Sequence, residues 1–152
     1  MQKSKTEQNL EQAFAGESMA HIKYRYFAKL CREQGYHEIA DHFEHTANQE
    51  VKHAWSHLEL ILGKPSAKQC LELAILGETY EYEEMYPKFE EDAEREGNEA
   101  MLLEARAQTL ESRQHAEEFQ QVLALAQHKF KALAKVEQLH ANKFGEKLRS
   151  LQ

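Results

Sequence analysis

Residues 37–62 read HEIADHFEHTANQEVKHAWSHLELIL and place a carboxylate and an imidazole on an apolar helical stripe. The apolar side chains recur at the three- and four-residue spacing of one helix face, and they are Ile39, Phe43, Ala47, Ala54, Leu58 and Ile61. Glu50 and His53 lie on the same face, three residues apart, so both can reach one metal ion. A charge on a core-facing stripe is costly unless an opposite charge meets it. The segment therefore predicts a helix that carries metal ligands.

Three further segments combine an apolar helical face with acidic or imidazole side chains. The polar residues on these faces are Glu17, Glu78, Glu81 and His115. Taken singly, such a residue is more often part of a solvated face, and the many glutamates after Glu81 fit that interpretation. Four segments with the same feature favour one shared metal centre.

Capping residues and glycines divide the chain into long helices. We expect helices over about residues 4–34, 37–62, 66–96 and 98–127, followed by an amphipathic C-terminal helix over residues 128–152. Gly35, Gly63 and Gly97 follow three of these segments, where glycine commonly ends a helix. Pro87 falls inside the third segment and predicts a kink or an unpaired carbonyl there. The pattern predicts an all-α fold, a four-helix bundle of residues 1–127 with an additional C-terminal helix.

The composition argues against several classes of protein. The chain has 152 residues, a one-domain length, and only 6 glycines and 2 prolines, which favours long helices. The net charge of −7 argues against nucleic-acid binding, and no apolar run approaches the roughly 20 residues that span a bilayer. The first residues do not resemble a signal peptide, and Cys31 and Cys70 form no closely spaced pair. We expect a cytoplasmic protein that binds neither nucleic acid nor membrane.

The C-terminal segment differs in charge from the rest of the chain. Residues 128–152 hold six lysines or arginines and two glutamates, a net charge of +4 within a chain of −7. A basic amphipathic helix can lie on a membrane surface. Packing on the acidic bundle or on a partner chain agrees better with the charge of about −11 on the remainder. We therefore expect a homodimer in which a helix can be exchanged.

The two halves of the helical region resemble one another. Glu17 matches Glu78, each directly after a glycine, and His53 matches His115 at almost the same offset along the chain. Such a repeat is what two related hairpins around a twofold-like metal site produce. We interpret the chain as two copies of one helical hairpin.

Three stretches carry a resemblance to a known family: AFAGES at residues 13–18, QEVKH at 49–53 and GETYEYEEMYP at 77–87. On these residues the chain resembles the rubrerythrin family over about residues 4–127, specifically its ferritin-like di-iron domain. The resemblance implies a ferritin-like bundle that binds two iron ions, although manganese or zinc could use the same ligand types. The metal ligands that it implies are Glu17, Glu50, His53, Glu78, Glu81 and His115. We expect no rubredoxin domain, since the four cysteines that it requires are not in the sequence.

One position departs from the family pattern. Rubrerythrins carry a glutamate three residues before the histidine of the fourth helix, whereas this chain has Ser112 there and Glu111 four residues before His115. Glu111 lies about 40° around the helix from His115 and can still reach the site, more easily if a π-bulge forms. Alternatively, Ser112 leaves a gap in the ligand set that water fills. We favour Glu111 as a further metal ligand.

The resemblance also implies a function. Rubrerythrin-like proteins reduce hydrogen peroxide to water at a di-iron centre, and two adjacent metals can deliver both electrons together. Tyr24 and Tyr86 match tyrosines that hydrogen-bond to ligand carboxylates in that family. We expect a peroxidase of oxidative-stress defence that receives electrons from an external donor such as a rubredoxin-like protein. The alternatives are a di-iron oxidase or ferroxidase that reacts with dioxygen, a ferritin-type iron-handling protein, and a non-catalytic helical module with a degenerate metal site.

Overall fold

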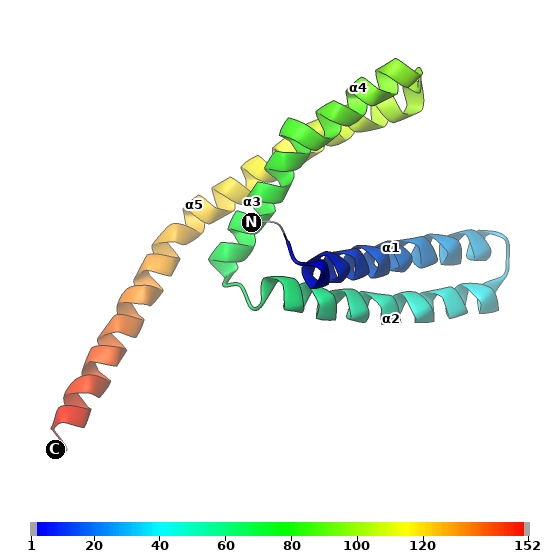
Figure 1. Ribbon diagram of the computed structural model, residues 1–152. Helices are drawn as coiled ribbons and strands as arrows, with labels where there is room; N and C mark the ends of the chain where they lie inside the picture. The colour runs from blue at the N-terminus through cyan, green and yellow to red at the C-terminus, as the bar shows by residue number, and fades with distance from the viewer. Residues whose placement is uncertain (1–2, 151–152) are drawn as a thin grey trace. The chain divides into compact units, whose positions relative to one another are not determined.

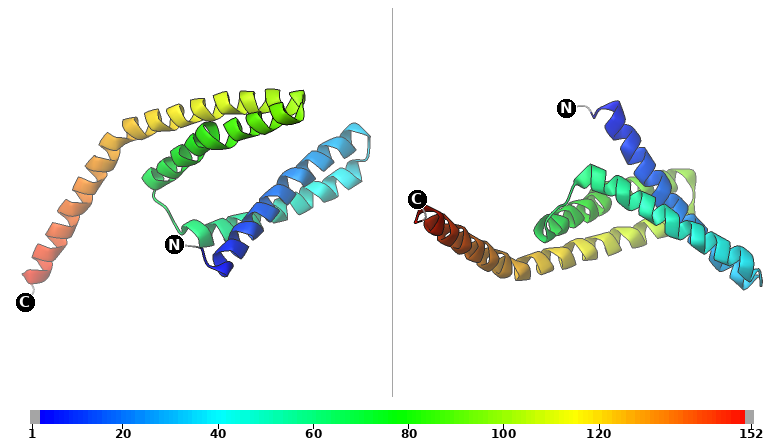
Figure 2. Two further views of the ribbon diagram at one scale, coloured as in Figure 1. Left: turned by 45° about the horizontal axis from the view of Figure 1, so that its top comes forward. Right: turned by 90° about the horizontal axis from the view of Figure 1, so that it is seen from below.

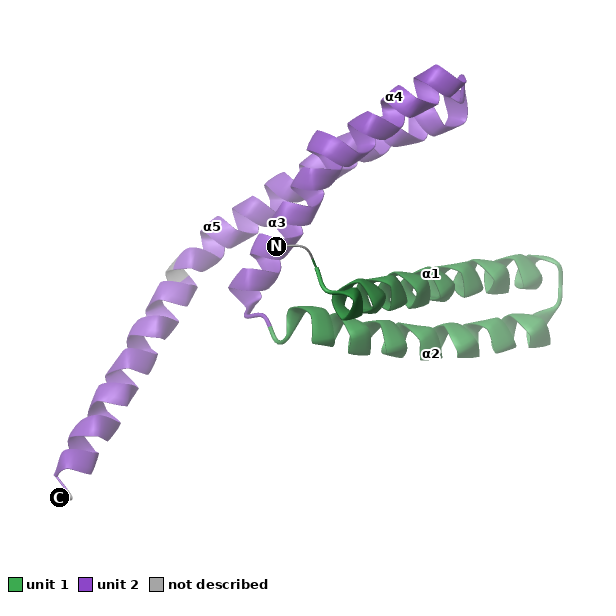
Figure 3. Cartoon of the chain, in the orientation of Figure 1, with its two compact units in different colours: residues 1–64 green, residues 65–152 purple. Residues whose placement is uncertain are grey.

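The structure is a computed structural model that describes residues 3–150, with the backbone alone for His128. Within this range every regular element is a helix, in the order α1, α2, α3, η1, α4 and α5. The expected all-α fold is confirmed. The chain divides into two compact units, Met1–Lys64 and Pro65–Gln152, each built on one helical hairpin (Figure 3).

Unit 1 is the hairpin of α1 (Lys5–Glu33) and α2 (His37–Leu62) (Figure 1). α1 begins at a capping box, in which the Ser4 hydroxyl accepts from the Glu7 N–H and the Glu7 carboxylate accepts from the Ser4 N–H. The turn between the helices contains Gly35, whose φ of 83° is readily adopted only by glycine. The helix limits predicted from the sequence are confirmed in this unit.

Unit 2 is a hairpin between an interrupted helix and a long one. The first arm consists of α3 (Ala67–Tyr80), η1 (Glu81–Met85) and α4 (Tyr86–Glu96). The second arm is α5 (Glu99–Arg149), capped by Asn98. α5 packs along all three segments of the first arm (Figures 1 and 2).

The first arm of unit 2 contains a π-helical turn next to Pro87. The sequence predicts one helix over residues 66–96 with a disturbance at this proline, and the disturbance is confirmed. The Tyr86 N–H donates to the Glu81 carbonyl, five residues back. Pro87 has no N–H, and its ring would crowd the carbonyl four residues earlier in a regular α-helix, so a wider turn relieves the clash. The π-bulge considered near Glu111 is not found there, since α5 is α-helical throughout.

α5 is much longer than the arm against which it packs. It has 51 residues, whereas the three segments of the first arm together run only from Ala67 to Glu96. The last part of α5 therefore extends beyond the start of α3 (Figures 1 and 2). The predicted C-terminal helix is present as a direct continuation of α5, and its apolar side chains Leu133, Val136 and Phe144 are exposed. Its packing on a bundle or a partner chain stays a prediction.

The buried side chains in the part of the chain that the structure describes are small. They are Ala28, Ala40, Ala47, Ala54, Ala93, Ala105, Ala116 and Ser112. Large apolar side chains such as Ile22, Trp55, Leu76 and Leu110 are exposed instead. No helix within residues 3–150 is both long and apolar enough to cross a bilayer. Each hairpin thus presents an apolar face that a second layer of helices must cover to complete a core.

Candidate metal centre

Unit 1 brings three predicted ligands together near the middle of its hairpin. Glu17 comes from α1, and Glu50 and His53 come from α2. One ligand atom from each residue lies within 4.8 Å of the other two. His53 Nδ1 is 3.2 Å from Glu50 Oε2, the contact expected of residues three apart on one helix face. Both carboxylates are half-buried and the imidazole is exposed, so the cluster is accessible to another helix.

The neighbouring Glu50 raises the pKa of the Glu17 carboxyl in this cluster. A side-chain hydrogen bond with Glu50 is the largest cause that raises the pKa of Glu17, followed by burial and the negative charge of Glu50. Carboxylates this close oppose each other's ionisation. A divalent cation removes the same repulsion without a proton, so this pair suits a metal.

His57 lies one turn after His53 on α2, beside the same cluster. Its Nδ1 atom is buried and has no hydrogen-bond partner within the described part of the chain. The charge of His57 acts on Glu17, where it lowers the pKa of the carboxyl against larger opposing causes. His57 is not one of the predicted ligands, and its four-residue spacing from His53 is the only signal in the sequence that points to it.

Unit 2 assembles a second group around its π-helical turn. His115 Nδ1 on α5 lies 3.4 Å from Oε2 of Glu78 on α3. Ser112, one turn earlier on α5, is only 3% exposed, and its hydroxyl donates a hydrogen bond of 2.9 Å to Oε2 of Glu81. Three predicted ligands, Glu78, Glu81 and His115, are therefore held by contacts between the two arms of this hairpin.

Comparison with known proteins identifies the family. The sequence profile of the Rubrerythrin family matches residues 8–123. This chain belongs to the rubrerythrin family. The rubrerythrin of Porphyromonas gingivalis is 40% identical to it over 107 residues, which cover 62% of this chain and 54% of that protein. The nigerythrin of Nitratidesulfovibrio vulgaris is 41% identical over 130 residues, which cover 75% of this chain and 63% of that protein.

Further matches include a third relative and a solved structure. The putative rubrerythrin of Methanocaldococcus jannaschii is 32% identical over 142 residues, covering 78% of this chain and 69% of that protein. A structure of nigerythrin in a mixed-valence state is 34% identical, covers 82% of this chain and 68% of that chain, and superposes with a TM-score of 0.40. The chain spans 54% and 63% of the lengths of the first two relatives.

Membership in the rubrerythrin family implies a di-iron cofactor, and the donor chemistry of both hairpins fits it. Carboxylates with imidazoles are the ligands of non-haem iron in ferritin-like bundles. In unit 1, Glu50 raises the pKa of the Glu17 carboxyl, and His57 Nδ1 is buried without a partner in residues 3–150. Each unit by itself brings together three of the ligands predicted from the sequence.

Glu111 does not occupy the inward position on α5. Ser112 is turned toward η1, where it contacts Glu81, while Glu111 is exposed. Around the helix, Ser112 lies about 60° to one side of His115 and Glu111 about 40° to the other. Glu111 is therefore on the flank of His115 away from Ser112, and it stays a proposed ligand.

The two predicted tyrosines have different surroundings. Burial is the largest cause that raises the pKa of Tyr86, followed by the negative charges of nearby glutamates, Glu81 first. Tyr86 thus lies near the unit 2 carboxylates and keeps its phenolic proton. Tyr24 packs against Phe43 and Phe27, with ring centroids 5.9 and 6.4 Å apart. Hydrogen bonds from either tyrosine to a ligand carboxylate stay proposals.

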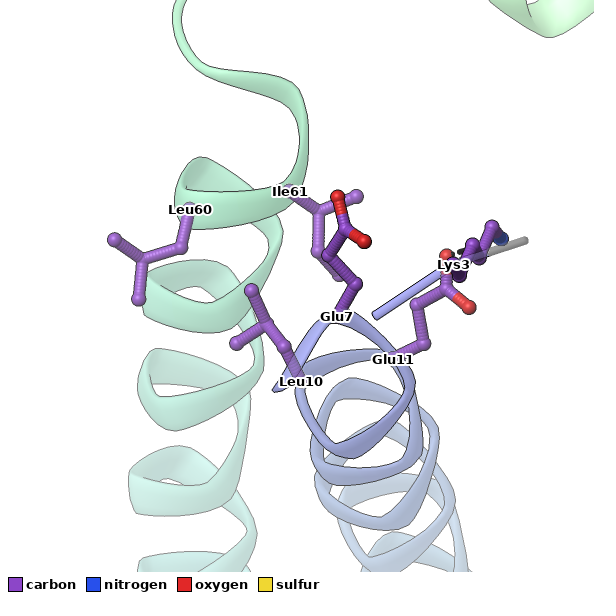
Figure 4. A pocket seen from close by; sticks show the side chains of 6 residues that line it. All are labelled: Lys3, Glu7, Leu10, Glu11, Leu60 and Ile61. Atoms are coloured by element: carbon purple, nitrogen blue, oxygen red, sulfur yellow. Dashed lines mark hydrogen bonds and ion pairs between the residues drawn. The ribbon is translucent and has the colours of Figure 1, made fainter. Parts of the chain in front are cut away.

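A separate hollow lies at the open end of unit 1 (Figure 4). Its volume is about 170 Å³, and its lining residues are Lys3, Glu7, Leu10, Glu11, Leu60 and Ile61. Glu7 is already bound to Ser4, and Glu11 pairs with Lys3. The acidic groups of this hollow are thus satisfied locally, and the candidate metal centre stays with the cluster at Glu17.

Proposed function

We propose that this chain is a non-haem di-iron peroxidase that reduces hydrogen peroxide to water with electrons from an external donor. The observation that carries the proposal is the cluster of Glu17, Glu50 and His53, whose ligand atoms lie within 4.8 Å of one another. The Glu78–His115 contact of 3.4 Å supports it from the second hairpin. Membership in the rubrerythrin family supports the class of reaction.

The charge of the ligand set suits two iron ions. Glu17, Glu50, Glu78 and Glu81 contribute four negative charges, and Glu111 is the proposed fifth. Two divalent ions balance four carboxylates, and a fifth helps to hold the trivalent state. When bound, the metals supply the two electrons that convert one peroxide and two protons into two water molecules. Manganese and zinc accept the same ligand types, so metal analysis must identify the ion.

The chain's own residues hold protons near this chemistry. Because the pKa of Tyr86 is raised, its phenol stays protonated at neutral pH and can donate a hydrogen bond to a carboxylate of unit 2. Because Glu50 raises the pKa of Glu17, the Glu17 carboxyl holds a proton more readily than an ordinary carboxyl, and a bound cation would displace that proton. We assign Tyr24 the corresponding orienting role in unit 1.

The proposed activity can be tested on the reduced, metal-loaded protein. The anaerobic diferrous protein is mixed with one equivalent of hydrogen peroxide, and the ferric absorbance is followed with time. We expect oxidation by peroxide to be much faster than by dioxygen at equal concentration. Equal rates of oxidation by peroxide and by dioxygen would favour a di-iron oxidase over the proposed peroxidase. A shell-forming oligomer that accumulates iron would instead favour a storage protein.

A second candidate is a non-catalytic helical module whose metal site has degenerated. The observation that favours it is the uncharged Ser112 at the position that the repeat matches with Glu50. Metal analysis of protein from iron-replete cells separates the two candidates. An iron content near two ions per ligand set supports the enzyme. Near-zero contents of iron, manganese and zinc would leave the non-catalytic module as the remaining candidate.

A further inference from the structure

His57 lies on the face of α2 that carries the predicted ligands Glu50 and His53. The three residues are spaced by three and four positions, which puts their side chains within about 60° of one another around the helix. His57 follows His53 by about one turn, a rise of about 6 Å along the axis. Because helical side chains lean toward the N-terminus of their helix, the imidazole of His57 leans over the turn that holds His53.

The Nδ1 atom of His57 is buried, and no protein group within the described residues bonds to it. In the same part of the chain, no second buried nitrogen or oxygen of a buried or half-buried side chain is unpaired. His21 on α1 instead donates from Nδ1 to the Ala47 carbonyl of α2, 2.7 Å away. A buried polar atom without a partner costs stability, and a bound ion is one of the groups that can satisfy it. His57 therefore has a ring nitrogen that packing alone does not explain.

A second observation places His57 near the carboxylates of the cluster. Glu50 is the first cause that raises the pKa of Glu17. The charges of His53 and His57 act in the opposite direction and lower it. A positive charge has this effect on a carboxyl group when it lies nearby. Unit 1 thus gathers two imidazoles and two carboxylates, one of these four groups from α1 and three from α2.

We propose that His57 is a further metal ligand and that unit 1 by itself binds one divalent transition-metal ion. The ion is held by four side chains, Glu17, Glu50, His53 and His57. Imidazoles with carboxylates are donors for zinc and for non-haem ferrous iron, and two histidines four residues apart on one helix face form a metal-binding pair. Two carboxylates also balance the charge of one divalent ion.

The proposal rests on the metal centre of the proposed function, but it requires no ligand from unit 2 and no redox reaction. All four ligands come from one hairpin, whose helices are joined by residues 34–36 alone. The ligands of unit 1 are therefore in place as soon as α1 packs on α2. We expect the chain to take up its metal in two steps, with the first ion bound by unit 1.

Cobalt titration of the full chain tests the ligand role of His57. The starting variant carries Glu78→Gln and His115→Gln, which removes two unit 2 ligands and leaves unit 1 unchanged. The metal-free protein is titrated with Co²⁺, and the visible absorbance of the bound ion gives the stoichiometry and the affinity. We expect one Co²⁺ per chain, bound roughly tenfold or more weakly when His57→Gln is added. His45→Gln is the matched control and should leave the affinity unchanged, because His45 is exposed and lies about 120° around α2 from His57.

Thermal unfolding of the same starting variant separates a metal ligand from a structural histidine. Without metal, adding His57→Leu should leave the melting temperature unchanged or raise it, because leucine has no buried nitrogen that lacks a partner. The rise in melting temperature that Co²⁺ produces should become smaller in this variant, since a weaker ligand stabilises the folded state less. A structural histidine predicts the reverse, a less stable metal-free protein with the full effect of Co²⁺.

Each outcome of these measurements decides the proposal. Unchanged Co²⁺ affinity in His57→Gln, the thermal behaviour of a structural histidine, or a starting variant that binds no Co²⁺ overturns it. These results leave the proposed function standing if the wild-type protein binds two iron ions and its diferrous form reacts with peroxide. A cobalt site that depends on His57, in a protein whose diferrous form does not react with peroxide, overturns the proposed function and leaves the role of His57 standing.

Discussion

The hydroxyl of Ser112 donates a 2.9 Å hydrogen bond to Oε2 of Glu81, across the two arms of unit 2. The repeat within the chain matches Ser112 with Glu50, which in unit 1 raises the pKa of Glu17. At this matching position, the second hairpin therefore has a neutral hydrogen-bond donor where the first hairpin has a carboxylate. In unit 2 the Ser112 hydroxyl holds the Glu81 carboxylate.

Substitution Ser112→Ala tests what this hydrogen bond contributes. We expect the free energy of unfolding of the metal-free protein to fall by about 1 kcal/mol, because a nearly buried hydrogen bond is lost. Metal affinity should also fall, since Glu81 loses the group that orients it. Thr109→Ala is the matched control: Thr109 makes a comparable bond to Glu90 from the same helix, 3.0 Å long. If both variants change the metal affinity equally, Ser112 does not orient Glu81 for metal binding.

Substitution Glu111→Ala tests the proposed additional ligand. We expect loss of one metal ion per ligand set, measured by elemental analysis, because a carboxylate beside His115 is removed. The metal-free protein should keep its stability, since Glu111 is exposed. Unchanged metal content would show that Glu111 is not a ligand and that the ligand set contains a gap at Ser112.

The stability of the metal-free protein should depend on the Glu17–Glu50 pair. The pKa of Glu17 is raised by folding, first through its hydrogen bond to Glu50. The stabilisation is therefore complete below the ordinary carboxyl pKa and is lost as the pH rises through the raised value. Urea unfolding across this range, with a chelator present, should show stability falling with increasing pH. Glu50→Gln should flatten the curve, because the amide adds no negative charge, and an unchanged curve would contradict the assignment.

Deletion of Glu83 tests whether the π-helical turn positions a ligand. A π-turn accommodates one additional residue, so removing an exposed one should restore a regular α-helix between α3 and α4. We expect helical content by circular dichroism to be kept and metal affinity to fall at least tenfold, as the Glu81 carboxylate moves away from Ser112. Glu83→Ala, which keeps the chain length, should retain wild-type affinity. If both variants bind metal equally, the turn has no positioning role.

Local signals in the sequence account for most of the helical architecture. Ser4, Ser66 and Asn98 cap three helices as their chemistry predicts, and Gly35 and Gly97 follow helix ends with positive φ. These features depend on contacts within a few residues, so they can be inferred without knowledge of the fold. Pro87 likewise predicts a disturbance, although its form as a π-turn depends on the packing of the whole arm.

The pairing of side chains between helices could be predicted only in part. The stripe positions of Glu17, Glu50 and His53 predict a shared site, and the packing of α1 on α2 brings their ligand atoms within 4.8 Å of one another. Ser112 and Glu111 are adjacent, so a rotation of α5 by about one residue decides which of them faces inward. The hydrophobic periodicity of the sequence does not resolve so small a rotation. The burial of His57 Nδ1 is equally hard to predict, because it depends on how α1 lies against α2.

The order of amino acids thus determines the helices, the two related hairpins, the acidic and imidazole groups on their apolar faces and, through its motifs, the rubrerythrin family. These are properties of periodicity, capping and residue type, which act over short distances. The tertiary structure decides that Ser112 rather than Glu111 contacts Glu81, and that Glu17 lies beside Glu50. Those relationships join residues on different helices that are far apart in the sequence, and only the packing of one helix on another brings them within a hydrogen bond.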